Sequence, residues 1–493
     1  MISFRLDIIL ISIMLSNVVF AQHTFEKIIA NPDDQVIRTV VEDVLGNFVM
    51  VGDKTINDIH VGYILKIDSA GNLLQETTIQ QTDTSSCFFY NIHCFNEQYY
   101  LTGLKNIDSV SDMLWYLKLN SNLEIENEKL LNIPNNRQIQ YINSILDSDS
   151  NFVVTGYTTR MDTNNYGNPF VNFDVYFYKL NIYGDSVTSK FYSTDASHDL
   201  SYDIIESYNS NKYYAFVYKF TNIYGTAGQR LTLSKNLDSL NIDSIPLSIK
   251  QHYSPTYINE TDILLCGLVS PFIADPHSLS VISMNEQAEL INFNQFKIEG
   301  DMRDFPSFYN GVSKNEDNIY VGGTSNMSYT NPNYSSVYSW FHLIKINPDI
   351  TPIWEYWYGG DAYYVLYSIL ATNDGGCLMV GCRYDYETQY NERDIYITKV
   401  NSEGLIVWTQ EIPIIKQSTT VYPNPGTNLL NIKTDNKKLD FELINLNGQV
   451  VIRQMLNNNH KTINTEFLKS GLYFYRLIDN KNKTVETGKW IKK

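Results

Sequence analysis

The sequence predicts an all-β protein, a seven-bladed β-propeller followed by a small C-terminal β-sandwich. Apolar runs, all but one of which end in glycine, recur every 50 to 61 residues through most of the chain, and most are followed by a second strand-like segment that ends in Asp or Asn. Clusters of Asn, Asp, Ser and Gly, the residues that favour tight turns, separate these runs. The period stops near residue 418, so the remaining residues to 493 form a module of their own.

The composition favours strands and excludes several classes of partner. Charged residues make up 18% of the 493 residues, below the roughly 25% typical of soluble chains. Tyrosine, a strong strand former, occurs 37 times. The formal charge of −17 and the pI of about 4.9 argue against nucleic acid and against electrostatic docking on anionic lipid.

The N-terminus has the pattern of a secretion signal, which we expect to cover residues 1–21. Arg5 supplies a charged start, an apolar run follows from Ile8 to Leu15, and Ala21 ends a small-residue cleavage site before Gln22. The run is shorter than the roughly 20 residues of a membrane span. We therefore expect an exported mature chain with no transmembrane segment.

The repeat consists of seven units. The glycine that ends the apolar run is present in six of them, and Val217 takes its place in the fourth. The six glycines are Gly52, Gly103, Gly156, Gly267, Gly323 and Gly381.

Each unit has about four strands, and in the last unit we expect them at 365–371, 377–382, 395–401 and 405–412. Ordering fifty residues costs about 75 kcal/mol, which one small sheet cannot recover alone. Stacking the units in a closed ring buries both faces of every sheet. The propeller should span residues 22–415, and His23–Ile29 should add a strand to the last blade and so close the ring.

The units resemble the loose glycine-tryptophan propeller repeats of exported bacterial proteins over residues 24–415. The seventh unit carries the pattern best, with Tyr358-Gly-Gly360, Asp374-Gly-Gly376 and Gly404-Leu-Ile-Val-Trp408. The resemblance implies a fold and does not imply a function.

The module at 416–493 begins after a linker at Ile414–Ser418 and has short strands separated by Asn and Gly turns. Its motifs resemble the type A C-terminal sorting domain of the type IX secretion system of Bacteroidetes. The motif residues are Tyr422, Pro423, Asn424, Pro425, Gly448, Gly471, Leu472, Tyr473, Gly488 and Lys489. The resemblance implies recognition by the type IX translocon, removal by a sortase-like peptidase, and a protein that is secreted or held at the cell surface.

Motifs of catalysis and metal binding are missing from the sequence. The eight histidines are scattered, and no nucleophile elbow, phosphate loop or dinucleotide fingerprint occurs. The segment Asp147–Asn151 resembles part of a calcium loop, but its position favours a hairpin turn. Five cysteines leave at least one thiol unpaired, so disulfides do not organise the fold. We assign no catalytic residue, no metal ligand and no cofactor.

Aromatic residues crowd one part of the repeat, which we place in one blade. Tyr356, Trp357, Tyr358, Tyr384 and Tyr386 could stack on sugar rings or anchor a protein partner, and packing within the blade is the alternative. The leading hypothesis is a non-catalytic propeller that binds a glycan, peptide or protein. The second hypothesis is a secreted hydrolase or lyase with its active site in the central funnel.

Overall fold

The computed structural model describes the chain from residue 22 with several gaps. The described residues are 22–79, 86–106, 112–133, 137–163, 167, 169–193, 198–220, 226–249, 254–269, 278–296, 303–316, 318–328, 330–388, 392–407, 419–434, 439–445, 449–456, 460–478 and 484–493. The chain forms two compact units, Met1–Trp408 and Thr409–Lys493. The expected signal at 1–21 and the expected linker at 414–418 lie outside the described residues.

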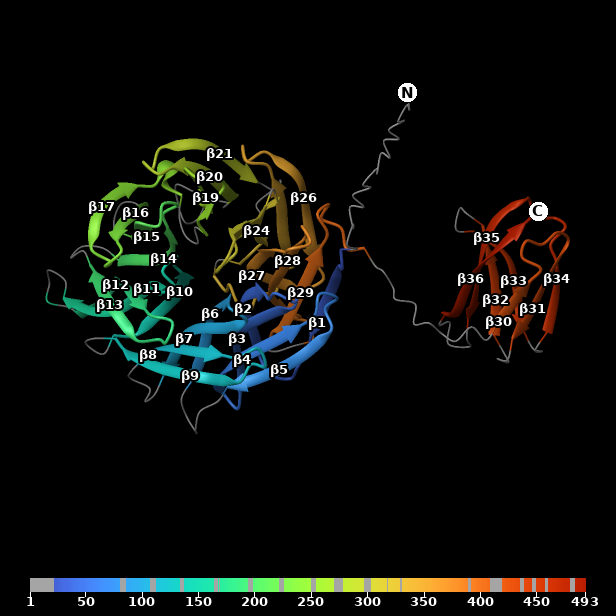
Figure 1. Cartoon of the computed structure of the whole chain (residues 1–493), viewed down its shortest axis with the longest axis horizontal. Helices are drawn as coiled ribbons and strands as arrows, with labels where there is room; N and C mark the ends of the chain where they lie inside the picture. The colour runs from blue at the N-terminus through green and yellow to red at the C-terminus, as the bar shows by residue number, and fades with distance from the viewer. Residues whose placement is uncertain are drawn as a thin grey trace, which may run out of the picture. The chain divides into compact units, whose positions relative to one another are not determined.

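Strands dominate both units, and the propeller class predicted from the sequence is confirmed. In the first unit the described residues form seven antiparallel sheets, which Figure 1 shows around a ring. Sheets 1 to 3 consist of β2 (Gln35–Glu42), β3 (Phe48–Ile56), β4 (Ile59–Ile67) and β5 (Leu73–Ile79); β6 (Cys87–Phe95), β7 (Gln98–Asn106), β8 (Asp112–Leu119) and β9 (Ile125–Asn132); and β10 (Ile139–Leu146), β11 (Phe152–Thr163), β12 (Pro169–Leu180) and β13 (Ser186–Tyr192).

Sheets 4 to 7 complete the ring. They consist of β14 (His198–Glu206), β15 (Lys212–Phe220), β16 (Thr226–Ser234) and β17 (Ser239–Ser244); β18 (Thr256–Tyr257), β19 (Asp262–Val269), β20 (Ser278–Asn285) and β21 (Leu290–Phe296); β22 (Phe305–Pro306), β23 (Val312–Asn315), β24 (Asn318–Ser325), β25 (Trp340–Ile346) and β26 (Pro352–Gly359); and β1 (Phe25–Ile29), β29 (Asp394–Val400), β28 (Cys377–Tyr384) and β27 (Tyr363–Ala371). A short 3-10 turn, η2 (Pro246–Ser248), follows β17.

In sheets 1 to 6 the first strand lies near the axis and the last lies at the rim, and in sheet 7 β27 lies near the axis and β1 lies at the rim (Figure 1). The rim strands are mostly exposed, and the second and third strands are buried on both faces, as the consecutive apolar runs predict. Apolar clusters join neighbouring sheets. One of them joins sheet 7 to sheet 1 through Ile397 and Tyr63, and it also contains Phe25 of β1.

The N-terminal strand closes the ring as the sequence predicts. β1 pairs with β29 along its whole length, from Phe25 opposite Lys399 to Ile29 opposite Ile395. The expected fourth strand at 405–412 is therefore wrong over its described part, because Leu405–Val407 are in no strand. β1 already occupies the edge of β29, and Val407 instead exchanges hydrogen bonds with Thr24 Oγ1 at 2.7 and 2.8 Å.

The repeat glycine has a steric function. A Cβ at Gly52 would lie 1.8 Å from the Val36 carbonyl oxygen of the inner strand, and one at Gly381 would lie 2.1 Å from the Val365 oxygen. Only glycine lets the second strand approach the first this closely.

Connections differ between the two ends of the ring. The turns after the first and third strands are short, and in most of them an Asp or Asn side chain accepts two backbone N–H bonds. Asp147 forms such a turn with the N–H groups of Asp149 and Asn151, so the turn expected at Asp147–Asn151 is present. We name this end the short-turn face and the opposite end the long-loop face, where connections such as 326–339 lie.

The second unit contains two antiparallel sheets. They are β30 (Thr419–Tyr422), β31 (Leu429–Thr434) and β34 (His460–Asn464), and β33 (Val450–Leu456), β32 (Leu439–Ile444), β35 (Gly471–Ile478) and β36 (Thr484–Lys492). Ile432 of the first sheet shares a core with Phe441 and Trp490 of the second. No disulfide joins the five cysteines, and no helix in the described part of the chain is long and apolar enough to cross a membrane.

Candidate ligand-binding site

A repeated β-bulge turns side chains of the inner strands toward the axis. The register shifts between Ile37 and Thr39 in β2 and at the matching place in β6, β14 and β27, and it shifts two residues earlier, between Ile139 and Tyr141, in β10. Bulges re-aim side chains at the positions where they interrupt a ladder. The residue after the bulge lines the axial channel in four of these strands, and these residues are Thr39, Asn91, Asp203 and Ser368.

A layer of tyrosines fills the channel toward the long-loop face. The Tyr141 ring stacks on Tyr309 with centroids 5.7 Å apart and an interplanar angle of 4°, and both rings meet the edge of Tyr90. Tyr202 packs at 5.2 Å against Tyr141, and Tyr367 at 6.1 Å against Tyr309. Burial raises the pKa of Tyr141, Tyr309 and Tyr367, so these hydroxyls stay protonated.

Two arginines hold this layer and are themselves paired. Arg38 donates to Tyr309 Oη at 3.1 Å and contacts the Asp53 carboxylate, and burial opposes its charged form while Asp53 raises its pKa. Arg393 donates to Asp34 Oδ2 at 2.6 Å and to Tyr367 Oη at 3.3 Å. Both guanidinium groups are therefore charged and locally compensated.

Four tyrosines outside this layer form what we call the tyrosine platform: Tyr334, Tyr338, Tyr384 and Tyr386. Tyr334 meets Tyr384 edge to face at 5.3 Å, and Tyr338 meets Tyr386 at 5.6 Å. The guanidinium of Arg393 lies 4.8 Å from the Tyr334 centroid, which joins the platform to the layer below. Tyr338 is 45% exposed, whereas Tyr384 is buried against Tyr367 and its neighbours.

The loop that carries two platform residues is held in place by hydrogen bonds. Tyr363 Oη donates to the Pro332 carbonyl at 3.1 Å, and Asn326 Nδ2 donates to the Tyr338 carbonyl at 2.7 Å. Ser339 Oγ donates to the Tyr364 carbonyl at 2.7 Å. The platform is thus ordered before any ligand arrives, which lowers the entropic cost of binding.

The five aromatics singled out in the sequence do not lie in one blade, contrary to expectation. Tyr356, Trp357 and Tyr358 are on β26, the rim strand of sheet 6, whereas Tyr384 and Tyr386 belong to sheet 7 and its loop. The repeat boundary falls between β26 and β27, so these two groups are neighbours in sequence and separate in the fold.

The β26 aromatics are partly used for packing. Tyr358 Oη donates to the Gly404 carbonyl at 2.7 Å, and a Cβ at Gly404 would meet the Tyr356 ring at 2.6 Å. Trp357 stacks on His342 with centroids 4.8 Å apart, and its Nε1 donates to Ser325 Oγ at 3.1 Å. Tyr356 and Trp357 remain 40% and 41% exposed, so this rim strand keeps accessible aromatic surface.

Below the tyrosine layer the channel widens into a polar chamber of about 220 Å³. Every sheet contributes a polar side chain to its wall, and these residues are Thr39, Asn91, Asn143, Asp203, Ser254, Asn310 and Ser368. Asn91 donates to Asn143 Oδ1, and Asn143 Nδ2 donates to Asp203 Oδ1 at 2.8 Å. Thr39 Oγ1 donates to the Tyr90 carbonyl at 3.1 Å, so hydrogen bonds within this ring of polar residues link sheets 1 to 4.

Sequence reasoning missed this ring, although a signal for it exists. Each of the seven polar residues lies 12 to 14 positions before the repeat glycine or Val217. In five units the residue just before it is an arginine or tyrosine of the layer above, as in Arg38 and Tyr90. An alignment of the seven units on their glycines would have shown both the polar position and the arginine or tyrosine position before it.

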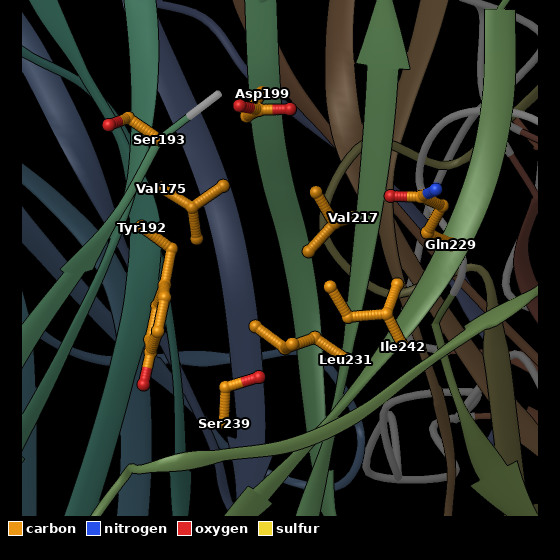
Figure 2. Close-up of a pocket in the computed structure, with 9 residues that line it drawn as sticks. All are labelled: Val175, Tyr192, Ser193, Asp199, Val217, Gln229, Leu231, Ser239 and Ile242. Atoms are coloured by element: carbon orange, nitrogen blue, oxygen red, sulfur yellow. The ribbon is translucent and has the colours of Figure 1, made fainter. Parts of the chain in front are cut away.

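A separate, mostly apolar pocket of about 130 Å³ lies between sheets 3 and 4 (Figure 2). Val175, Val217, Leu231 and Ile242 form its apolar wall, and Asp199 stands at one end of it in Figure 2.

Two histidines in the described residues are each paired with a carboxylate. No group of three or more His, Cys, Asp or Glu side chains in the described residues is placed to hold a metal ion. His60 Nδ1 lies 2.8 Å from Asp53 Oδ2, and His342 Nε2 lies 2.6 Å from Glu355 Oε1. No described Ser, Thr or Cys is hydrogen-bonded to the Nε2 atom of His60.

The sorting motif residues gather around Trp490 in the second unit. Trp490 Nε1 donates to the Pro423 carbonyl at 2.8 Å, and Asn424 Nδ2 donates to the Lys489 carbonyl at 2.8 Å. β35 and β36 place Tyr475 opposite Gly488 and Tyr473 opposite Trp490. Tyr422 ends β30, Pro425 lies three residues further on, Gly471 and Leu472 begin β35, and Gly448 lies outside the described residues.

Comparison with known proteins identifies the tail. Residues 420–493 match the secretion system C-terminal sorting domain. The protein is therefore exported through type IX secretion to the cell surface or the extracellular space. No curated protein matches the chain.

Solved structures resemble the first unit only distantly. A neuraminidase-like protein of subtype N10 from influenza A/little yellow-shouldered bat/Guatemala/060/2010 has 10% identity, a TM-score of 0.36, and coverage of 63% of this chain and 93% of its own. The α-L-arabinofuranosidase Arb93A of Fusarium graminearum has 8% identity, a TM-score of 0.42, and coverage of 78% and 99%. The β-propeller domain of the Trilobed protease of Pyrococcus furiosus has 11% identity, a TM-score of 0.41, and coverage of 76% and 95%. At these identities the similarities say nothing about ligand or activity.

Proposed function

We propose that the protein is an exported propeller that binds neutral glycans, without catalysis, at the tyrosine platform. The observation that carries this proposal is the pairing of Tyr338 with Tyr386 and of Tyr334 with Tyr384 across two ordered loops. Aromatic faces beside hydroxyl groups suit the alternating apolar and hydroxyl surfaces of sugars.

The electrostatics favour a neutral ligand. Arg38 and Arg393 are each matched by a carboxylate, so neither guanidinium is an uncompensated cation for an acidic ligand. The net charge of −17 would also repel acidic polymers.

The sorting tail supports the delivery half of the proposal. After the N-terminal signal at 1–21 is removed, the tail at 416–493 would be recognised by the type IX translocon of a Bacteroidetes cell. A sortase-like peptidase would then cut the tail, and the propeller would be released or joined to the surface. The motif residues from Tyr422 to Lys489 would form the recognised module.

The test is a glycan array followed by calorimetry on the chain from residue 22. We expect binding of a neutral glycan that falls about tenfold, or about 1.4 kcal/mol, for each of Tyr338→Ala and Tyr386→Ala. Tyr183→Ala removes an exposed tyrosine from a turn on the short-turn face and should leave binding unchanged. Equal loss in all three variants, or no glycan bound by the parent, would refute the proposal.

A hydrolase is the second candidate, because His60 and Asp53 form a His–Asp pair beside the arginine of the tyrosine layer. Its test is a panel of chromogenic hydrolase substrates with His60→Ala as the comparison. If the protein turns over a substrate and His60→Ala abolishes this turnover at constant glycan affinity, the protein is a hydrolase. That result would contradict the absence of catalysis in the first proposal.

A further inference from the structure

The axial chamber holds a carboxylate that lies outside the tyrosine platform. Among the described residues that line it, Asp203 is the one carboxylate, and none of them is a lysine, arginine or histidine. Its side chain accepts from Asn143 Nδ2 at 2.8 Å and from the Ser254 backbone N–H at 3.2 Å, and it is almost fully buried. Burial is the largest cause that raises the pKa of Tyr141 and of Cys266, and the charge of the neighbouring Asp203 is the second largest.

The chamber continues into a wider vestibule of about 510 Å³ toward the short-turn face. Ile145 lines both cavities, so they follow one another along the inner strands. Val41, Ile145 and Leu370 give the vestibule an apolar wall, and Glu42 and Asn373 stand at the turns where it ends. At the other end, Tyr309 lines the chamber and the tyrosine layer closes it.

The channel is thus a blind well with an apolar collar and an acidic, oxygen-rich floor. From the Val41 level to the Thr39 level is two strand residues, or about 7 Å. A primary alkyl ammonium group has this shape, because its methylene stem can lie along apolar side chains while its three N–H groups meet oxygen acceptors.

We propose that the axial well binds a primary alkyl ammonium group, with Asp203 as its anionic partner and Val41, Ile145 and Leu370 against its methylenes. The side chain of a lysine and a free alkyl amine share this chemistry. This proposal concerns the face opposite the tyrosine platform and does not depend on the glycan proposal.

The experiment is calorimetry on the chain from residue 22 at pH 7 with n-pentylammonium, with pentan-1-ol as the neutral isostere and methylammonium as the stemless cation. We expect saturable binding of pentylammonium at least tenfold tighter than that of either control compound. A blocked lysine peptide forms a second arm. Binding of pentylammonium alone points to a free amine, and binding of both points to a lysine side chain as an acceptable ligand.

The variants assign the site. Asp203→Asn should weaken pentylammonium binding at least tenfold, whereas Asp185→Asn, at an exposed turn, changes the net charge equally and should have no effect. Leu370→Trp fills the vestibule, leaves Asp203 in place and should also prevent pentylammonium binding. If melting curves show that Asp203→Asn is unfolded, this second variant tests whether the amine binds in the well. The Tyr338→Ala, Tyr386→Ala double variant should bind the amine normally. Equal affinity for pentan-1-ol, or unchanged binding in folded Asp203→Asn or folded Leu370→Trp, would overturn the proposal.

Discussion

The hydroxyl of Tyr99 in sheet 2 donates a 2.9 Å hydrogen bond to Oδ2 of Asp43, which lies in the β2–β3 turn of sheet 1. Lys66 Nζ lies 3.1 Å from the same oxygen and donates to Tyr99 Oη at 3.0 Å. The arrangement recurs two sheets further on, where Tyr213 and Lys179 meet Asp147 Oδ2 at 2.6 and 3.1 Å. Each set ties one sheet to the next through a carboxylate that also holds its own turn.

Tyr99→Phe should destabilise the propeller by about 1–3 kcal/mol, because it leaves a buried carboxylate oxygen and the Lys66 ammonium one partner short. Urea unfolding of the chain from residue 22, followed by tyrosine fluorescence or circular dichroism, measures this change.

The matched control is Tyr100→Phe, one residue further on. That hydroxyl donates to Gln98 Oε1 at 3.0 Å within its own strand, so its loss removes no contact between sheets. If the two variants have the same free energy of unfolding, the link between sheets contributes nothing measurable.

Acid should weaken the same contacts. Burial alone would raise the pKa of Asp43 and Asp147, but the hydrogen bonds from Asn47, Lys66 and Tyr99 lower the first, and those from Tyr213, Asn151 and Lys179 lower the second. A carboxyl whose folded pKa lies below its unfolded pKa stabilises the fold above the unfolded value of about 3.9, and this stabilisation is lost as the pH falls through the folded pKa.

We therefore expect the free energy of unfolding to drop between pH 5 and pH 3 by more in the parent than in Asp43→Asn, which has no carboxyl to protonate there. Unfolding curves at pH 7, 5, 4 and 3 give the comparison. A parallel decline in both proteins would show that other carboxyl groups control the acid sensitivity.

Ring closure depends on Phe25, the first residue of β1. Phe25 lies in the core shared by sheets 7 and 1. Its ring packs against Gly71 so closely that a Cβ on Gly71 would lie 2.7 Å from the Phe25 Cγ atom. Phe25→Ala should cost about 3–5 kcal/mol and lower the melting temperature by several degrees. Ile28→Ala on the same strand is the control, because Ile28 is 47% exposed and should cost well under half as much. Equal losses would mean that β1 adds strand pairing without core packing.

Much of this ring could be predicted because its cause is local. The apolar run that ends at Gly52 or Gly381 reflects two local features of the fold. Its consecutive apolar residues indicate a strand buried on both faces, and its glycine indicates a backbone too close to the neighbouring strand for a Cβ. The role of residues 23–29 followed from the same period. A strand that precedes the first unit belongs to no unit of its own, so it is expected to pair with the free edge of the last sheet.

The positions of the axial ring residues follow the repeat, but the contacts within that ring and within the tyrosine platform could not be predicted in the same way. Asp203 and Asn143 are adjacent because two bulges and the curvature of the ring bring them together, and neither is encoded in the spacing of apolar residues. Tyr338 and Tyr386 meet across two irregular loops of different sheets, and no strand period relates them. The strand expected at 405–412 was wrong for a related reason, because the competing partner, β1, lies more than 370 residues away in the chain.

The repeat glycine gives a sharper test of the fold. A Cβ at Gly52 would meet a backbone oxygen at 1.8 Å, and neither strand can move without breaking its ladder. Gly52→Ala should cost more than about 3 kcal/mol, at or beyond the upper end for overpacking in a core. Gly46→Ala, at a turn with φ of +76° and open space around it, should cost about 1–2 kcal/mol. Melting temperatures of the two variants rank them, and the reverse order would contradict the close approach of β2 and β3.

Export should depend on the packing of one side chain in the tail. Trp490 is fully buried on β36, packs against Tyr473 and bonds the Pro423 carbonyl, so Trp490→Ala should cost about 3–5 kcal/mol and unfold a module of this size. Phe474→Ala on the neighbouring strand removes an aromatic ring that is 46% exposed, and it should leave the tail folded. We expect the first variant to accumulate inside the cell envelope and the second to reach the surface or the medium, as measured by immunoblot of the separated fractions. Normal delivery of Trp490→Ala would mean that the translocon reads the extended chain rather than a folded domain.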